Sequence, residues 1–172
     1  LEQGVKEWRA KAEAADRAHP ILVEADFRDA IERKDYSAAT AIMQLAKESK
    51  RDPSQSVLLE SQLLAAQGKM REATAVLENA LQTGIDNSVV YRALGSVLEQ
   101  AGNIEGAQRQ YEEAYKRRPG DMQTVRQLVG ALVRNGNAQR ALEVLRDARQ
   151  LAGLDEEIAD VWLGLEGQLG DR

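Results

Sequence analysis

The sequence is poor in the residues that most often carry chemistry or build large cores. Its 172 residues include no cysteine, one histidine and three prolines, and only 4% are aromatic. The lack of cysteine excludes disulfides, thiolate metal sites and cysteine nucleophiles. Because large rings are so few, a core has to be built mainly from Ala, Leu and Val, which suits closely stacked helices better than a core around aromatic side chains.

Long hydrophobic runs and basic patches are missing as well. No apolar run approaches about eighteen residues, so the sequence as given predicts no membrane-spanning helix. The net charge is −5, and no stretch forms the basic patch that a phosphate backbone requires, so nucleic acid is a poor candidate partner. These absences do not fix the compartment, although an exported bacterial protein in the periplasm fits slightly better than a cytoplasmic one.

Signals for catalysis are few. His19 precedes a proline at a predicted helix boundary, where we expect a capping or exposed role rather than that of a ligand or base. The sequence has no Gly-rich phosphate loop, metal-ligand cluster or nucleophile motif. Adjacent acidic pairs such as Glu112 and Glu113 diverge on a helix and do not form an acid/base couple. We therefore predict no enzymatic activity, no cofactor and no metal site.

What the sequence does contain is a repeat. A shift of 34 residues carries Gly102 onto other glycines and carries Ala107 and Ala114 onto other alanines. The three columns are Gly68, Gly102, Gly136 and Gly170; Ala39, Ala73, Ala107 and Ala141; and Ala46, Ala80, Ala114 and Ala148. A period of this size indicates a helical solenoid. The two alanine columns share one face of each second helix, where small side chains let a neighbouring helix approach closely.

Residues 88–121 hold the most complete copy of the pattern, aromatic-x2-Leu-Gly-x2-Leu followed by Ala-x3-Tyr-x2-Ala and Pro. The structural signature residues are Tyr91, Leu94, Gly95, Leu98, Gly102, Ala107, Tyr111, Ala114 and Pro119. This spacing resembles the tetratricopeptide repeat (TPR) family over residues 20 to about 170. The copies at 54–87 and 122–155 replace the first aromatic residue with valine. The copy at 20–53 has Lys34 at the turn position and Phe27 where a small residue is usual.

The resemblance implies an all-α fold, a right-handed α-solenoid of stacked antiparallel helix pairs. We name the first helix of each pair the A helix and the second the B helix. The predicted order is an N-terminal capping or connector helix at 1–19, four repeats at 20–53, 54–87, 88–121 and 122–155, and a half repeat at 156–172. This half repeat holds an A helix alone, and we expect it to be truncated inside a longer array. Predicted N-caps are Asp52, Asp86 or Asn87, Asn103 and Asp121.

In proteins that this chain resembles, ligands lie along the concave surface formed by the A helices. Three rows of positions would face that surface. They are Glu24, Leu58, Arg92, Arg126 and Asp160; Arg28, Gln62, Ser96, Gly130 and Gly164; and Ala65, Glu99, Val133 and Gly167. The second row is small or uncharged over its last four members, which leaves room for an extended peptide or a helix. The candidate partner-binding residues are Glu24, Arg28, Leu58, Gln62, Arg92, Ser96, Glu99, Arg126, Gly130 and Val133.

Within these rows, Arg92 and Arg126 lie one repeat apart and are able to hold acidic groups, because a guanidinium binds a carboxylate in two-pronged fashion. The alternative is that both arginines are solvated or paired with nearby Glu99. Chaperone-binding TPR domains clamp a terminal carboxylate with lysines and asparagines. The matching positions here are Glu24, Arg28, Leu59, Gln123 and Gln127. That pattern is absent, so heat-shock chaperone tails are not the expected ligand.

We therefore predict a non-enzymatic scaffold that docks a protein or peptide partner on its concave face. The Ala-, Gln- and Arg-rich style of the repeats suggests a bacterial multi-component assembly for secretion, pilus formation or exopolysaccharide export. Two alternatives stay open. One is a structural spacer or self-assembly module whose array ends, Trp8 and Trp162 included, carry the contacts. The other is a regulatory segment of a longer enzyme or transporter.

Overall fold

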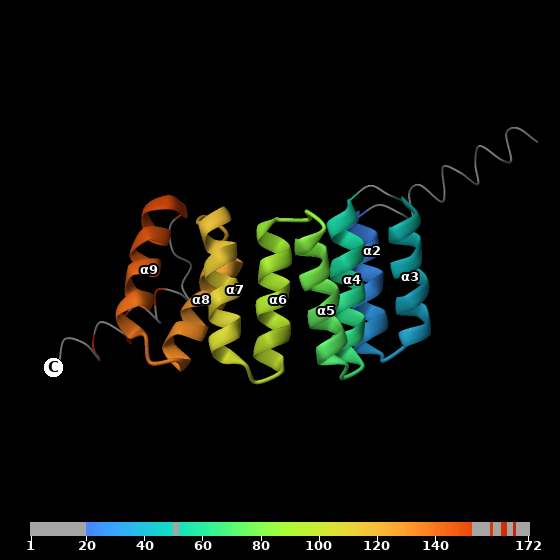
Figure 1. The fold of residues 1–172 in the computed structure, drawn as a ribbon. Helices are drawn as coiled ribbons and strands as arrows, with labels where there is room; N and C mark the ends of the chain where they lie inside the picture. Colours follow the sequence, from blue (N-terminus) through green and yellow to red (C-terminus); the bar gives the residue numbers. More distant parts are fainter. Residues whose placement is uncertain (1–19, 50–51, 153–158, 160–162, 165–166, 168–172) are drawn as a thin grey trace, which may run out of the picture. The chain divides into compact units, whose positions relative to one another are not determined.

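The computed structural model describes residues 20–49, 52–152, 159, 163–164 and 167 (Figure 1). The predicted helix at 1–19, with Trp8 and His19, lies outside the described residues. So does most of the predicted half repeat, including Asp160 and Trp162. The chain divides into two compact units, Leu1–Val76 and Leu77–Arg172, and we describe each by itself.

The described residues form eight helices and no strand. The first unit contains α2 (Pro20–Glu32), α3 (Tyr36–Ser49), α4 (Pro53–Ala66) and the first half of α5 (Met70–Gln82). The second unit contains the rest of α5, then α6 (Ser88–Gln100), α7 (Ile104–Arg117), α8 (Met122–Arg134) and α9 (Ala138–Ala152). The all-α fold class predicted from the sequence is confirmed.

Each unit buries its own apolar core between successive helices. In the first unit α3 packs against both α2 and α4, and in the second α7 packs against α6 and α8 while α8 packs against α9. Phe27, the large residue where a small one is usual, is 2% exposed and belongs to the core of the first unit. Tyr111, Leu128 and Leu145 are fully buried in the core of the second unit.

Helix starts follow the predicted caps with one correction. The side chains of Asp52, Asn87 and Asn103 accept hydrogen bonds from backbone N–H groups in the first turns of α4, α6 and α7. Asp121 occupies the N-cap position of α8 but makes no side-chain bond to the backbone. Its Oδ2 instead accepts a hydrogen bond from Thr124 Oγ1 at 2.5 Å, so a side-chain hydroxyl takes the place of the backbone donor.

The turn between the A and B helices has the same geometry in all four described pairs. Gly68, Gly102 and Gly136 have φ of 78°, 81° and 75°, and Lys34 has φ of 58° at the matching position of the first pair. In the first pair the Lys34 N–H donates to Ile31 O at 2.9 Å and the Asp35 N–H to Ala30 O at 2.8 Å. This pattern satisfies the last carbonyls of a helix and needs a left-handed residue. The first pair therefore keeps the turn at the cost of a strained lysine.

A glycine at position 34 should relieve that strain. We expect Lys34→Gly to stabilise the first unit by about 0.5–1 kcal/mol, since the relief of left-handed strain exceeds the added entropy of the unfolded chain. Urea unfolding followed by circular dichroism measures the change. The matched control is Gly68→Ala. A Cβ there would meet nothing within 4 Å, so only backbone strain should destabilise the turn, by about 1 kcal/mol. A Lys34→Gly variant less stable than the native chain would show that the lysine is not strained at this turn.

A second glycine is required by a close approach between two helices. A Cβ built on Gly95 of α6 would lie 2.5 Å from the ring of Tyr111 on α7. The ring cannot easily retreat, because it is fully buried and its hydroxyl donates to Glu99 Oε2 at 2.6 Å. The aromatic ring of one helix thus fills the space that glycine leaves on its partner.

Adding a methyl group at this position should overpack the α6–α7 contact. We expect Gly95→Ala to destabilise the second unit by roughly 1–3 kcal/mol, measured as a shift of the urea midpoint. Combining it with Tyr111→Leu, which removes the ring, should make the added methyl group much less costly. If Gly95→Ala lowers the free energy of unfolding equally with and without the Tyr111 ring, the contact between Gly95 and the ring is not the cause of the destabilisation.

Candidate functional site

The second unit carries an open hollow between its two complete A helices. Its volume is about 470 Å³. Ser96, Glu99 and Gln100 of α6 line one side, and Arg126, Gln127, Gly130 and Arg134 of α8 line the other. We name it the α6–α8 hollow. Four of the predicted partner-binding residues, Ser96, Glu99, Arg126 and Gly130, come together here.

The other predicted positions lie elsewhere. Arg92 does not line the hollow. Its side chain is 20% exposed, and its Nε lies 3.7 Å from Asp121 Oδ2, with which it forms an ion pair. Val133 is 41% exposed on α8. In the first unit, Glu24 and Arg28 are exposed on α2, Gln62 is exposed on α4 and Leu58 is half-buried there. Gly164 and Gly167, at the predicted ends of two rows, are both exposed.

Three residues of the hollow, Gln100, Gln127 and Arg134, were not predicted from the sequence. Gln100 and Arg134 occupy matching positions of two repeats, each one helical turn beyond a predicted residue, Ser96 or Gly130. Residues four apart share a helix face. Extending the second row by one turn would therefore have found both. Gln127 belongs to no row, although it is one of the positions that match the clamp of chaperone-binding TPR domains.

Glu99 is the electrostatic centre of the hollow. Its Oε1 accepts an ion-paired hydrogen bond from Arg134, and its Oε2 accepts the hydrogen bond of Tyr111. Burial, together with the bond to Glu99, raises the pKa of the Tyr111 hydroxyl, so that it stays a donor even at alkaline pH where an exposed tyrosine ionises. The carboxylate is thus held by a core residue on one side and by a surface arginine on the other.

Gln127 supplies a different kind of group. Its Oε1 is covered from solvent and has no hydrogen-bond partner within the described part of the chain. A covered acceptor without a donor costs free energy that a new donor would recover.

A second hollow, of about 490 Å³, lies beside the turn that joins α8 to α9. We name it the turn hollow. Its lining is Glu105, Gln108, Arg109, Arg134, Asn135 and Asn137. Gln108 Oε1 accepts hydrogen bonds from Asn135 Nδ2 at 2.6 Å and Asn137 Nδ2 at 3.3 Å, so the amides there are largely occupied by one another. Arg134 borders both hollows.

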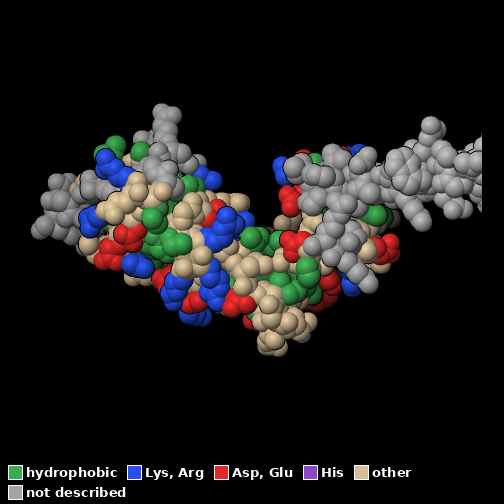
Figure 2. Space-filling view, turned by 90° about the horizontal axis from the view of Figure 1, so that it is seen from above, with side chains coloured by type: hydrophobic (Ala, Val, Ile, Leu, Met, Phe, Trp, Pro, Cys, Tyr) green, Lys and Arg blue, Asp and Glu red, His purple; other side chains and the backbone are tan. Residues whose placement is uncertain are grey.

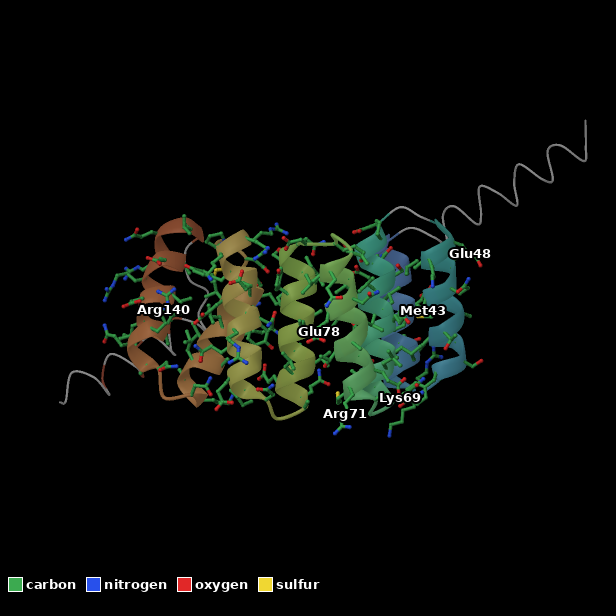
Figure 3. All side chains as sticks on the ribbon, in the orientation of Figure 1. Met43, Glu48, Lys69, Arg71, Glu78 and Arg140 are labelled. Atoms are coloured by element: carbon green, nitrogen blue, oxygen red, sulfur yellow. The ribbon has the colours of Figure 1, made fainter. Side chains whose placement is uncertain are left out.

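Charged side chains outside these hollows are interspersed in sign. On the face seen in Figure 2, Lys and Arg alternate with Asp and Glu, and hydrophobic side chains lie between them. Figure 3 shows Arg71 at the start of α5 and Arg140 on α9. Arg140 pairs with Glu143 at 2.8 Å. Such exposed pairs contribute little to stability and do not define a site.

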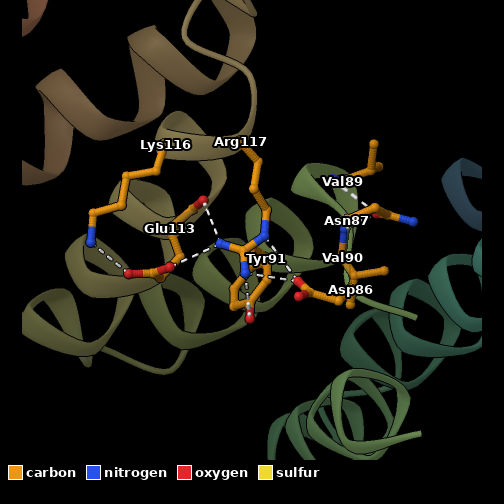
Figure 4. A network of polar contacts seen from close by, with 8 residues as sticks. All are labelled: Asp86, Asn87, Val89, Val90, Tyr91, Glu113, Lys116 and Arg117. Carbon is orange, nitrogen blue, oxygen red and sulfur yellow. Dashed lines mark hydrogen bonds and ion pairs between the residues drawn. The ribbon is translucent and has the colours of Figure 1, made fainter. Parts of the chain in front are cut away.

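The densest polar network belongs to the fold (Figure 4). Arg117 of α7 donates to Asp86 and Glu113, and its guanidinium carbon lies 4.0 Å from the centre of the Tyr91 ring. Lys116 and Arg117 lower the pKa of Glu113, whereas burial raises the pKa of Tyr91. Because the donors of Arg117 are used within the network, it ties α7 to the start of α6 and leaves little for a ligand.

The described residues show no arrangement for metal binding or membrane crossing. No group of three or more His, Asp or Glu side chains gathers there in a way that could hold a metal ion. Within the same residues, every helix is too short or too polar to span a bilayer.

Comparisons with known proteins agree with the geometry. No protein-family model matches the chain. A TPR repeat-containing protein of Dictyostelium discoideum is 41% identical over 54 residues, which are 31% of this chain and 20% of that protein. The chain therefore spans only a small part of this curated relative.

Solved structures match over most of the chain. PilF of Pseudomonas aeruginosa has a TM-score of 0.70 at 15% identity, covering 94% of this chain and 72% of that one. A chain of the Naa15/Naa10 complex bound to HypK-THB has a TM-score of 0.68 at 17% identity, with coverage of 88% and 23%. A tetratricopeptide repeat protein of Parabacteroides merdae has a TM-score of 0.66 at 15% identity, with coverage of 88% and 60%.

These matches place the chain in the class of all-α helical-repeat proteins. More particularly, it has the tetratricopeptide-repeat fold, and the predicted resemblance to the TPR family is confirmed.

Gly130 lines the α6–α8 hollow and offers a direct test of why a glycine is there. It has no positive φ, and a Cβ on it would meet only the guanidinium of Arg134, at 3.6 Å or more. The helix therefore has no structural need for glycine, and we expect Gly130→Ala to stabilise it by roughly 0.5–1 kcal/mol. The urea midpoint should rise, opposite to the fall expected for Gly95→Ala. A loss of stability would mean that Gly130 serves the fold and not the hollow.

Proposed function

We propose that this chain is a non-enzymatic scaffold that docks a segment of a protein partner in the α6–α8 hollow. The observation that carries the proposal is the meeting of four predicted groove residues, from two successive A helices, around one open hollow. Its volume of about 470 Å³ falls in the range of about 300–1,000 Å³ found for binding sites, and suits a few side chains of a bound segment.

The lining suits recognition and not catalysis. Its polar groups are a carboxylate, two guanidinium groups, two amides and a hydroxyl, all of which can form hydrogen bonds with a peptide. The one carboxylate, Glu99, is already bound by Tyr111 and Arg134, so it is poorly placed to act as a base. Gly130 and Ser96 have the smallest side chains of the lining, which lets a main chain approach the helices.

The setting of this function is also part of the proposal. A bacterial assembly for secretion, pilus formation or polysaccharide export, with the chain in the periplasm, is supported by the style of the repeats. The structural likeness to PilF is compatible with this setting and concerns the fold alone.

Site-specific photo-cross-linking in cells of the native organism tests the docking surface. A photoreactive amino acid in place of Gln100, an exposed residue that lines the hollow, should yield a discrete cross-linked protein. The matched control is the same substitution at Gln139, an exposed residue of α9 that lines neither hollow. Adding Gly130→Phe, which fills the hollow, should reduce the cross-linked product roughly tenfold or more, the factor that a loss of about 1.4 kcal/mol produces.

Three results would count against this function. Cross-linking that is equal at the two glutamines, or confined to Gln139, would place the partner elsewhere. A product at Gln100 that is unaffected by Gly130→Phe would show contact without docking in the hollow. If neither position cross-links and the mass of the protein rises with its concentration, the self-assembly alternative takes precedence.

A further inference from the structure

We propose that the segment docked in the α6–α8 hollow carries an Asp or Glu side chain, and that Arg126 and Arg134 bind its carboxylate. This inference rests on the proposed docking function and names the chemistry of the partner. It departs from the sequence hypothesis of an Arg92 and Arg126 pair, because the structure engages Arg92 with Asp121 and puts Arg134 in the hollow instead.

The spacing of the two arginines on α8 supports a shared ligand. Arg126, Gly130 and Arg134 follow one another at intervals of four residues, so all three lie on one face, and the two arginine Cα atoms are about 12 Å apart. The guanidinium of Arg134 extends back over Gly130, 3.6–4.0 Å from where a Cβ would be. This brings the Arg134 guanidinium towards Arg126 along α8, so a carboxylate has a shorter distance to bridge between the two side chains. Guanidinium groups bind carboxylates with two parallel hydrogen bonds, which lysine cannot do.

Arg134 can leave its ion pair with Glu99 and bind a carboxylate of the ligand instead. Their ion pair is partly solvated, with the Arg134 side chain 48% exposed and that of Glu99 29% exposed, and such pairs are weak. When Arg134 turns to a ligand, Glu99 still has the hydrogen bond from Tyr111. The charged side chains that line the hollow are two arginines and one glutamate, so the lining attracts a carboxylate. This complementarity favours an acidic segment over a neutral or basic one.

Gln127 favours a carboxylate attached to a main chain. Its Oε1 lacks a donor within the described residues and lies next to Arg126 in sequence. If the amide turns towards the hollow as the segment enters, a backbone N–H of that segment can supply the donor. A free anion has no such group. A nucleic acid is disfavoured by the net charge of −5 and by Glu99 in the hollow itself.

The test uses the chain as it is and two short synthetic peptides with acetylated and amidated ends. One contains Glu and Asp among Gly and Ala residues, and the other replaces them with Gln and Asn, which keeps the shape and removes the charge. Titration followed by backbone amide NMR should show shifts at Ser96, Gln127 and Gly130 with the acidic peptide. We expect the neutral peptide to bind at least about tenfold more weakly. Raising sodium chloride from about 0.05 M to about 0.5 M should weaken the acidic complex.

Paired variants identify the residues responsible. Arg126→Gln with Arg134→Gln should lower affinity for the acidic peptide to that of the neutral one, while the melting temperature stays close to the native value. The matched control is Arg71→Gln, at the start of α5 and outside both hollows, which should bind like the native chain (Figure 3). Equal binding of the two peptides, no binding of the acidic one, or unchanged binding by the double variant would each overturn the proposal. The proposal would also be overturned if sodium acetate shifted the same amide signals with the same affinity as the acidic peptide.

The outcome can be separated from that of the docking function. A partner cross-linked through Gln100 by a segment without Asp or Glu would uphold docking and overturn the acidic-segment proposal. Specific binding of the acidic peptide with no partner cross-linked in cells would uphold the acidic-segment chemistry of the hollow and overturn the docking function.

Discussion

The structure depends on how closely the helices can approach one another at the alanine columns. Ala39, Ala73, Ala107 and Ala141 are each 0% exposed. A larger side chain at any of them would push two helices apart, since interiors are packed as densely as crystals. Because the column recurs every 34 residues, each described B helix has a small, fully buried side chain at the same position, which limits how far the helices packed against it can lie. The hollow between α6 and α8 is a consequence of that spacing.

Much of the fold could be predicted from the sequence, because the helices and turns recur with a fixed spacing of small residues along the chain. The repeat columns predicted a helical solenoid, and the turn at Lys34 shows that the fold imposes its geometry even where the preferred glycine is missing. The side-chain pairings could not be predicted. Periodicity places Arg92 and Arg126 in one row, but whether a long side chain turns to the groove depends on which carboxylate lies nearer. Asp121 engages Arg92, and Arg134, which no row included, lines the hollow.

The hollow is also connected to the core through a single side chain. Tyr111 packs against Gly95 and donates to Glu99, which in turn binds Arg134. A residue of the repeat signature therefore orients the charges of a surface that varies between repeats. The pair of Tyr111 and Glu99 is particular to this repeat, because the positions 34 residues away from Glu99 are Ala65 and Val133. The fold fixes where these side chains lie, and the residues at those positions decide what the surface can bind.

Arg134 belongs to two hollows at once, and this sets a rule for anything that binds there. A group that draws its guanidinium into the α6–α8 hollow withdraws it from the turn hollow, beside Asn135 and Asn137. If both hollows bind ligands, their occupancies are linked through Arg134, and by reciprocity each ligand changes the affinity of the other by the same factor. A partner long enough to cover both would have to divide one arginine between them.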